Sequence, residues 1–294
     1  LSLYDMRNRF IYTDNVLASS DVPTVVDTFL DLASTTAEVG QMIDTRGYSV
    51  AGIGSNTYQA YAGTATIGGI HSASATAGVY WALVRNGDLH DVDVGSIPDN
   101  STDNFTALNL GFTALASLTG MSNGILRLSS GTTKTSGQIS IPPGCKLKGT
   151  GSGGNWSTGD GVAHGTSPSY SSRLLYTGTA SVNIILMADG TFDAGVEDLY
   201  IDGGRTVPQI QAWADAFNAP IALPEIIVGI RSTSSLGARC KNIRIQNVTY
   251  GIFFDTTSTH PNSHGDWNNI LIQTCNIGVL MAGIYNQSPV SNQT

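Results

Sequence analysis

The chain has 294 residues, a net charge of −8 and only 12% Asp, Glu, Lys and Arg, against 41% hydrophobic residues. Because phosphate recognition needs clustered Lys and Arg, and the sequence has no such cluster, we expect no nucleic-acid partner. No apolar run reaches the roughly 20 residues that a membrane span requires, so we expect no membrane insertion.

The first 100 residues divide into a leading segment and a small module. Residues 1–37 are irregular apart from "DVPTVVDTFLDLA", which predicts a short helix between Asp21 and Ala33. Residues 38–100 are strand-like and rich in Gly, which indicates a small β-rich module.

An amphipathic helix is predicted next, over residues 103–118. Its apolar face is formed by residues at spacings of three and four: Phe105, Leu108, Phe112, Leu115 and Leu118. Thr102 or Asp103 is expected to cap its N-terminus.

Two similar stretches near the end of the sequence reveal a repeat. "CKNIRIQNVTYGIFF" starts at Cys240 and "WNNILIQTCNIGVLM" at Trp267, so matching positions lie 27 residues apart. Apolar and polar residues alternate within each stretch, which predicts half-buried strands, with Gly251 at a turn. Short strands without helical periodicity favour the coils of a parallel β-helix. The preceding amphipathic helix would then close the open end of the stack.

An earlier coil is recognisable in "GVEDLYIDGG", where Asp198 matches Asn242 at a spacing of 44. The excess over one period predicts an insertion, assigned to Arg205–Glu225 because its prolines and amphipathic centre interrupt the strand pattern. A Gly-Ile pair at 229–230 is expected to begin another turn, 22 residues before Gly251.

Three other features carry no chemistry in this interpretation. The three cysteines lack metal or disulfide spacing, and Cys275 is expected to pack inward because it shares a repeat position with Val248. "GTGSGG" at 149–154 is expected to be a turn, since no helix pattern follows it to bind a nucleotide. "HPNSHGD", with His260 and His264, is expected to be a loop, and we predict no metal or cofactor.

The candidate ligand-binding residues are Trp213 and Phe217 in the insertion, and Asp202 on the outward face in register with Gln246 and Gln273. Tryptophan stacks well on sugar faces, although packing of the insertion on its own coil or on another subunit is an alternative for both aromatic residues.

No catalytic pair can be assigned. Glycoside hydrolysis requires two carboxyl groups roughly 5–9 Å apart. Asp198 shares its repeat position with Asn242 and Asn269, which favours a structural side-chain ladder over catalysis.

Several short motifs, in this order, resemble a known family. They are Gly47-Tyr48, Thr102-Asp103-Asn104 with Thr106-Ala107, Ile141-Pro142-Pro143-Gly144, and Gly149-Thr150-Gly151. Together they are similar to the N-terminal part of phage tailspikes with a pectate-lyase-like, right-handed parallel β-helix. The resemblance covers residues 38–285, with Asn100 and Asn123 standing where glycine is common.

The resemblance implies an all-β homotrimer of the virion, outside the host cell. Residues 1–37 would anchor the chain, 38–100 would form a head/tail-attachment module that docks on portal-adaptor or nozzle proteins, and 101–294 would hold the capping helix and first coils. The β-helix would recognise host surface polysaccharide, which such proteins often degrade. Two alternatives stay open: a free secreted polysaccharide lyase or hydrolase, and a non-enzymatic adhesin or fibre.

One more coil is expected after the sequence printed here. Adding the period to Asn269 places the next coil's asparagine at position 296, beyond Thr294. We therefore expect the polypeptide to continue, and any active site of an enzyme to lie beyond residue 294.

Overall fold

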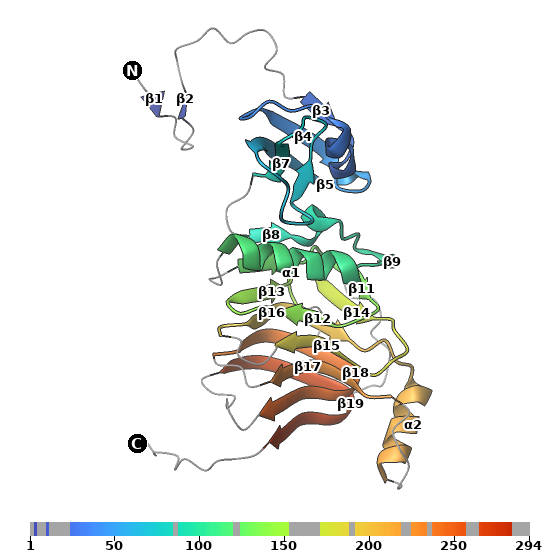
Figure 1. Ribbon diagram of the computed structural model, residues 1–294. Helices are drawn as coiled ribbons and strands as arrows, with labels where there is room; N and C mark the ends of the chain where they lie inside the picture. The colour runs from blue at the N-terminus through green and yellow to red at the C-terminus, as the bar shows by residue number, and fades with distance from the viewer. Residues whose placement is uncertain are drawn as a thin grey trace, which may run out of the picture.

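A computed structural model describes residues 3–4, 10–11, 24–84, 88–119, 124–152, 171–187, 192–218, 225–233, 237–256 and 265–283. A small sheet and a long stack of parallel strands follow one another in Figure 1, with helix α1 lying between them. Two short strands, β1 (Leu3–Tyr4) and β2 (Phe10–Ile11), form a separate antiparallel pair.

The small sheet has five strands in the order β3-β4-β5-β7-β6. They are β3 (Thr24–Val26), β4 (Met42–Gly47), β5 (Ala51–Ala62), β6 (His71–Ala73) and β7 (Val79–Leu83). A 3₁₀ helix, η1 (Phe29–Ser34), contributes Phe29 and Leu32 to a core that includes Tyr58 and Trp81.

The unit therefore begins before residue 38, and the helix predicted over Asp21–Ala33 is replaced in its described part by β3 and η1. The β-branched pair at Val25 and Val26 favours a strand. The Asp31 carboxylate accepts the Thr28 backbone N–H at 2.8 Å, which starts η1 only after that strand.

The long stack is a parallel β-helix with three ladders of strands, which confirms the predicted fold. The first ladder contains β8 (Asp88–His90), β10 (Gly124–Arg127) and β13 (Cys145–Lys148). The second contains β9 (Asp99–Asp103), β11 (Gly131–Thr135) and β14 (Ser172–Tyr176). The third contains β12 (Ile139–Ile141), β15 (Val182–Met187) and β17 (Ile227–Thr233).

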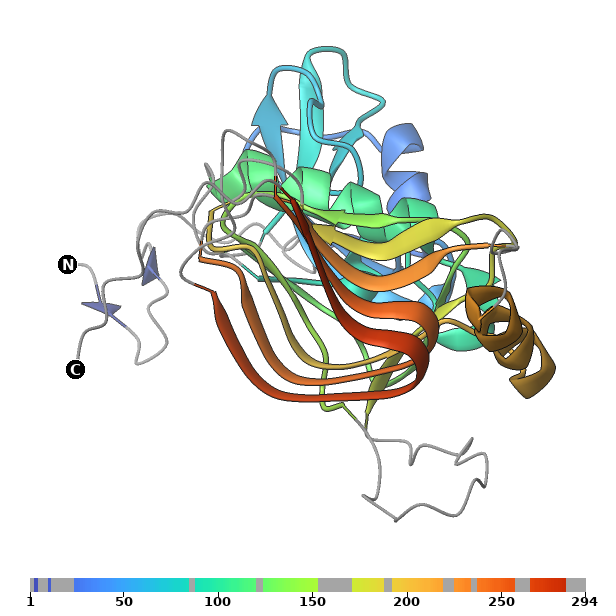
Figure 2. The same cartoon turned by 90° about the horizontal axis from the view of Figure 1, so that it is seen from below.

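Three longer strands bend around the corners and join more than one ladder. β16 (Gly195–Asp202) runs through the first and second ladders, whereas β18 (Arg239–Thr256) and β19 (Asp266–Gly283) run through all three. Figure 2 shows these coils superimposed, viewed along the stack. The 27-residue register is confirmed, since Ile243 pairs with Ile270, and Val248 with the half-buried Cys275.

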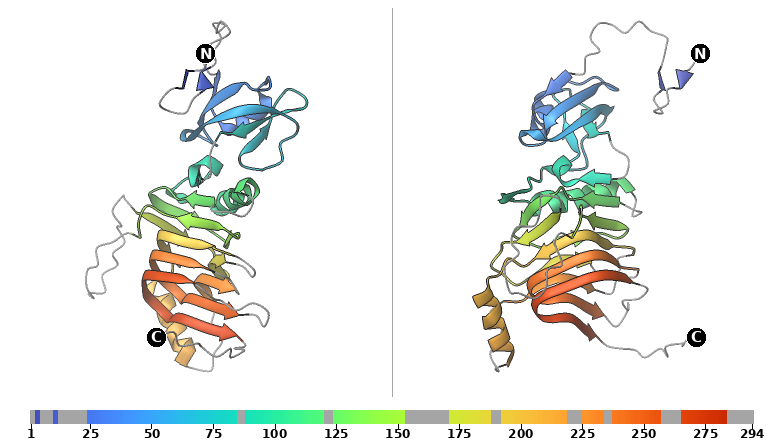
Figure 3. Two further views of the ribbon diagram at one scale, coloured as in Figure 1. Left: turned by 90° about the vertical axis from the view of Figure 1, so that its left-hand side faces the viewer. Right: turned by 180° about the vertical axis from the view of Figure 1, so that it is seen from behind.

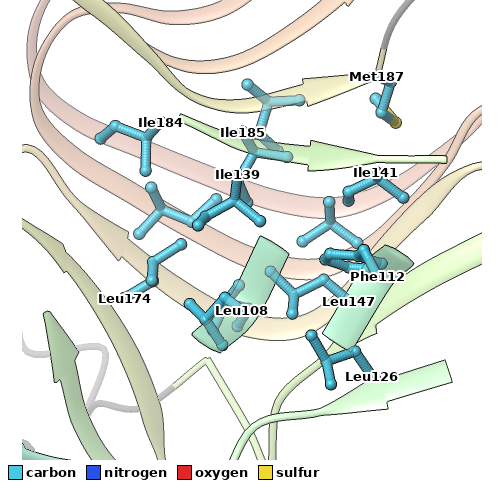
Figure 4. Packing of buried hydrophobic residues seen from close by; sticks show 14 of the residues in the cluster. Leu108, Phe112, Leu126, Ile139, Ile141, Leu147, Leu174, Ile184, Ile185 and Met187 are labelled. Carbon is cyan, nitrogen blue, oxygen red and sulfur yellow. The ribbon is translucent and has the colours of Figure 1, made fainter. Parts of the chain in front are cut away.

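Every second side chain of each ladder points into the stack, as the two-residue period of a strand requires. In the first ladder these residues form a column of Leu89, Leu126, Leu147, Val196, Cys240 and Trp267. The third contributes Ile139, Ile185, Ile230 and Ile252, all nearly inaccessible to solvent. Stacked aliphatic columns of this kind form the continuous core seen in Figure 4.

Helix α1 (Phe105–Thr119) closes the N-terminal end of the stack, as predicted. It connects β9 of the second ladder to β10 of the first, so it occupies the position of a third-ladder strand in the first coil. Leu108, Phe112 and Leu115 are buried in the core, while Phe105 and Leu118, at the two ends, are 37% and 47% exposed.

The start of α1 differs by two residues from the prediction. The helix begins at Phe105, directly after Asn104, whose side chain is hydrogen-bonded to the backbone of Ile97. Asp103 still caps the helix, because its carboxylate accepts the Phe105 backbone N–H at 3.1 Å.

Left-handed residues make the corners of the coils. Asp198, Asn242 and Asn269 have φ of 54°, 54° and 52° between the first and second ladders, and Asn247 has φ of 57° between the second and third. Asn and Asp tolerate this conformation better than other residues with a side chain.

Gly251 does not sit at a turn, contrary to the prediction. It lies inside β18, where a Cβ would stand 2.5 Å from the carbonyl oxygen of Gly278 and 2.6 Å from Ile272 Cγ2. The repeated glycine therefore provides space for the isoleucine of the next coil.

A short 3₁₀ helix, η2 (Asp91–Val94), joins the small sheet to the β-helix. The Asp91 carboxylate accepts the Ser129 hydroxyl at 2.7 Å, and the Asp93 carboxylate accepts the Asn56 amide at 3.0 Å. Ser129 follows β10, and Asn56 lies in β5, so two neighbouring carboxylates of one short helix hold both units.

Candidate functional site

The outer face of the second ladder carries a polar cluster that is built from three successive coils. Its members point outward because they alternate with the inward Leu174, Ile201 and Ile245. Strand pairing sets Arg173 beside Tyr200 and Tyr200 beside Arg244, while Asp202 lies beside Gln246. Four charged or polar side chains and one aromatic ring from three successive coils thus meet on one surface.

Asp202 lies at the centre of this cluster. One carboxylate oxygen accepts a hydrogen bond from Arg173 at 2.6 Å and from the Tyr200 hydroxyl at 2.7 Å. The other accepts the backbone N–H of Gly204 at 2.8 Å and the Asn247 amide at 3.0 Å. Every donor is directed at the charged form, so the carboxylate holds three coils in place.

Burial would raise the pKa of the Asp202 carboxyl, but the Arg173 guanidinium and the hydrogen-bond donors outweigh it, so the pKa lies below its ordinary value. Burial and the neighbouring Asp202 carboxylate raise the pKa of Tyr200 far above its ordinary value. At neutral pH Asp202 is therefore ionised and Tyr200 is a neutral hydroxyl donor. Neither group is suited to act as a general acid or base.

Tyr200 also lies between two arginines. The guanidinium carbon of Arg173 is 5.4 Å from the ring centroid, and that of Arg244 is 5.2 Å away. Cation–π contacts of this kind are attractive within about 6 Å and hold the guanidinium planes in fixed orientations. The two arginines are consequently pre-organised on the outer surface.

Asp202 occupies the predicted register beside Gln246 and Gln273, but only 1% of the residue is exposed. Arg173 and Tyr200 both donate hydrogen bonds to its carboxylate and cover it, and direct contact of Asp202 with a polysaccharide stays a prediction.

The insertion predicted at Arg205–Glu225 is present and contains helix α2 (Val207–Asn218), which projects from the corner after β16. Arg205 makes two hydrogen bonds to the Glu225 carboxylate, at 2.6 and 2.8 Å, and its guanidinium lies over the Tyr176 ring. A bidentate ion pair therefore closes the base of the insertion.

Helix α2 lies outside the coils, against β18 and β19. Trp213 is fully buried and belongs to the core cluster, which agrees with the alternative of packing on its own coil. In this structure it presents no surface to a ligand. Phe217 lies in α2, but its side chain is outside the described residues.

The predicted side-chain ladder at the first corner is confirmed. The Asn269 amide donates to Asn242 at 2.9 Å, and the Asn242 amide donates to the Asp198 carboxylate at 2.8 Å. Lys148 lies 3.4 Å from the same carboxylate. Asp198 is thus part of the scaffold, as its repeat position indicated.

Other predicted positions are less informative. Gly149 follows β13 at the first corner and sits too close to Asp198 for a side chain, consistent with a turn. His260 and His264 lie outside the described residues. Among the residues that are described, no cluster of His, Cys, Asp and Glu could hold a metal ion. No helix in the described ranges is long and apolar enough to cross a membrane.

Comparisons with known proteins support the fold. No protein-family model matches the chain, and no curated protein matches its sequence. A solved structure of tailspike protein gp49 from Acinetobacter baumannii bacteriophage Fri1, a capsular polysaccharide depolymerase, is similar with a TM-score of 0.63 and 17% identity. The similarity covers 88% of this chain and 46% of gp49.

Two further structures are similar. WceF of Pantoea stewartii, a glycan biofilm modifying enzyme with a tailspike-like parallel β-helix, has a TM-score of 0.52 and 12% identity, over 96% of this chain and 44% of its own. The tailspike of Acinetobacter phage vB_ApiP_P1 has a TM-score of 0.51 and 16% identity, over 82% and 39%. The chain therefore has the parallel β-helix fold of tailspikes and spans less than half the length of these proteins.

Proposed function

We propose that this chain is the N-terminal part of a tailspike-type virion protein that binds a bacterial surface polysaccharide through the outer face of its β-helix. The observation that carries this proposal is the pre-organised cluster of Arg173, Tyr200 and Arg244 on that face. The tailspike-like fold of gp49, itself a capsular polysaccharide depolymerase, supports the same proposal.

The chemistry of the cluster suits a saccharide. Sugar hydroxyls donate and accept hydrogen bonds, and Gln246 and Gln273 offer both functions beside the arginines. Arginine guanidinium groups donate in a fixed plane, so a face that holds two of them in place loses little conformational entropy on binding.

The small five-stranded module is proposed to attach the protein to the tail, and the assembly is proposed to be a homotrimer. The module lies at the end of the β-helix that α1 closes, so it does not cover the outer faces of the coils (Figure 3). Static light scattering should give three times the chain mass, and a monomer at micromolar concentration would contradict the trimer.

The binding proposal is tested with a panel of purified bacterial capsules and lipopolysaccharides. We expect the protein to be retained on the immobilised polysaccharide and to bind it in a calorimetric titration. If no preparation is bound at millimolar saccharide, the proposal fails.

A reducing-end assay on the bound polysaccharide separates the remaining functions. New reducing ends would indicate a depolymerase, whereas binding without cleavage would favour a non-enzymatic adhesin.

A further inference from the structure

The Lys and Arg side chains of the described residues fall into two groups. Most form ion pairs with a carboxylate, on the small sheet, on the first and third ladders, at the insertion and, for Arg173 with Asp202, on the second ladder. The exceptions in the described part of the chain are Lys134 and Arg244, which have no carboxylate within ion-pair distance. Both lie on the outer face of the second ladder.

This pattern is unexpected in a chain with a net charge of −8, where carboxylates outnumber cations. Asp103 is in register with Lys134, but its carboxylate accepts hydrogen bonds from the Ser136 hydroxyl at 2.5 Å and the Phe105 N–H at 3.1 Å. Asp202 lies in the next column from Arg244, but its charge is matched by Arg173. Neither cation is therefore neutralised by these neighbouring carboxylates.

Arg244 is held in place without being neutralised. Its guanidinium packs over Tyr200, and one terminal nitrogen donates to the Gln273 side chain at 3.1 Å. Its Nε is buried without a hydrogen-bond partner among the described residues. A fixed guanidinium that lacks an anion is suited to bind a carboxylate, which can accept two parallel hydrogen bonds from it.

The spacing of the two cations suits a chain-like ligand. Lys134 is in β11 and Arg244 in β18, and β14 and β16 lie between them. At about 4.8 Å for each of three steps, the backbones at the two positions are about 14 Å apart along the stack. A single anion cannot bridge this distance, but a polymer with repeated acidic groups can.

We propose that the outer face of the second ladder binds an acidic polysaccharide, with a sugar carboxylate on Arg244 and a second acidic group of the same chain near Lys134. The proposal rests on the proposed function and adds the chemical class of the polysaccharide. The saccharide chain would run along the stack, past Arg173 and Tyr200.

The test compares two variants of the full chain that remove the same charge. Arg244→Gln removes the unpaired cation, whereas Arg127→Gln removes the cation that pairs with Asp88 on the outer face of the first ladder. Binding to the host polysaccharide is titrated at low salt, before and after chemical reduction of its carboxyl groups to alcohols. Dextran sulfate serves as a probe with sulfate groups and dextran as a neutral one.

We expect Arg244→Gln to weaken binding to the native polysaccharide about 10-fold, because a charge-assisted contact is lost, and Arg127→Gln to change it less than about 2-fold. Carboxyl reduction should weaken wild-type binding by a similar factor and abolish the difference between the variants. Lys134→Gln should show a smaller loss, and it tests the same surface if Arg244→Gln does not fold.

Equal binding by wild type and both Arg244→Gln and Lys134→Gln, or undiminished binding of the reduced polysaccharide, would overturn this inference while leaving the proposed function intact. Wild-type binding to dextran sulfate as tight as to the native polysaccharide would overturn the assignment of a carboxylate. If wild type binds no host polysaccharide, the proposed function fails instead.

Discussion

The outer faces of the first and second ladders are built from strands with the same alternating pattern, yet their charged side chains are arranged differently. On the first, three ion pairs each join neighbouring coils: Arg127 with Asp88 at 2.6 Å, Lys146 with Glu197 at 2.9 Å, and Lys241 with Asp266 at 2.9 Å. On the second, one buried carboxylate, Asp202, organises a cluster of arginines around a tyrosine.

The difference shows how one repeat can carry two kinds of outer surface. Ion pairs distributed over the surface contribute little stability each, about 0–1 kcal/mol, but each of these three joins side chains of two neighbouring coils. A buried carboxylate that receives several donors contributes more and orients its partners. The first face is therefore suited to align coils, and the second to hold arginine side chains in fixed positions for the proposed ligand.

The largest expected effect is at the centre of the second face. Asp202→Asn leaves the half-buried Arg173 without its counter-charge and replaces an acceptor by an amide donor, so we expect a loss of about 3 kcal/mol in the free energy of unfolding at pH 7. Urea denaturation measures it. A loss below about 1 kcal/mol would show that the cluster does not depend on this carboxylate.

The difference in the free energy of unfolding between wild type and Asp202→Asn should depend on pH. The folded-state pKa of Asp202 lies below its unfolded value, so its contribution is complete above the unfolded pKa of about 3.9 and is lost as the pH falls through the lower folded pKa. The difference between wild type and Asp202→Asn should therefore shrink in acid. A difference that grows below pH 4 would contradict this assignment.

Substitutions at the corner between the two outer faces should cause an intermediate loss of stability. Asn242→Ala leaves a residue at φ 54° that tolerates this conformation less well than asparagine, and it removes the hydrogen bond to Asp198. We expect it to lower the free energy of unfolding by about 2 kcal/mol. Asn242→Gly, the matched control, adopts this φ freely and should cost about 1 kcal/mol. Equal losses would mean that the left-handed conformation is not what the asparagine provides.

The smallest effect is expected on the first face. Glu197→Gln removes the carboxylate shared by Lys146 and Lys148. Burial raises the pKa of Glu197, but the two lysines outweigh it and hold the pKa below its ordinary value. Because all three side chains are partly exposed, we expect a loss of no more than about 1 kcal/mol, decreasing in high salt. A loss as large as that of Asp202→Asn would remove the distinction between the two faces.

The sequence predicts the parts of this molecule that repeat. The alternation of Ile243 and Ile245, the period of 27 and the Asp198 ladder all follow from matching side chains in successive coils. The turn was misplaced at Gly251 because a glycine that makes space looks the same in sequence as a glycine that turns the chain. Asn247, with its positive φ, makes that corner.

The arginine cluster was not predicted, because its members come from coils that lack a common spacing. Arg173 precedes Tyr200 by 27 residues, but Tyr200 precedes Arg244 by 44, since the insertion lies between them. Their residue types also differ, so no self-similarity marks the column. A search for arginines in register with an aromatic residue, once the insertion is removed, would have identified it.

The short helix η2 has a mechanical consequence. Its Asp91 and Asp93 side chains are almost fully buried and hydrogen-bond to opposite units, and Gly54 approaches Val92 so closely that a Cβ would stand 2.1 Å from its carbonyl oxygen. Rotation of the small sheet about this joint would expose both carboxylates and break their hydrogen bonds. A force or torque applied to the small sheet should therefore move the first coil with it as one rigid body, because the joint does not bend like a hinge.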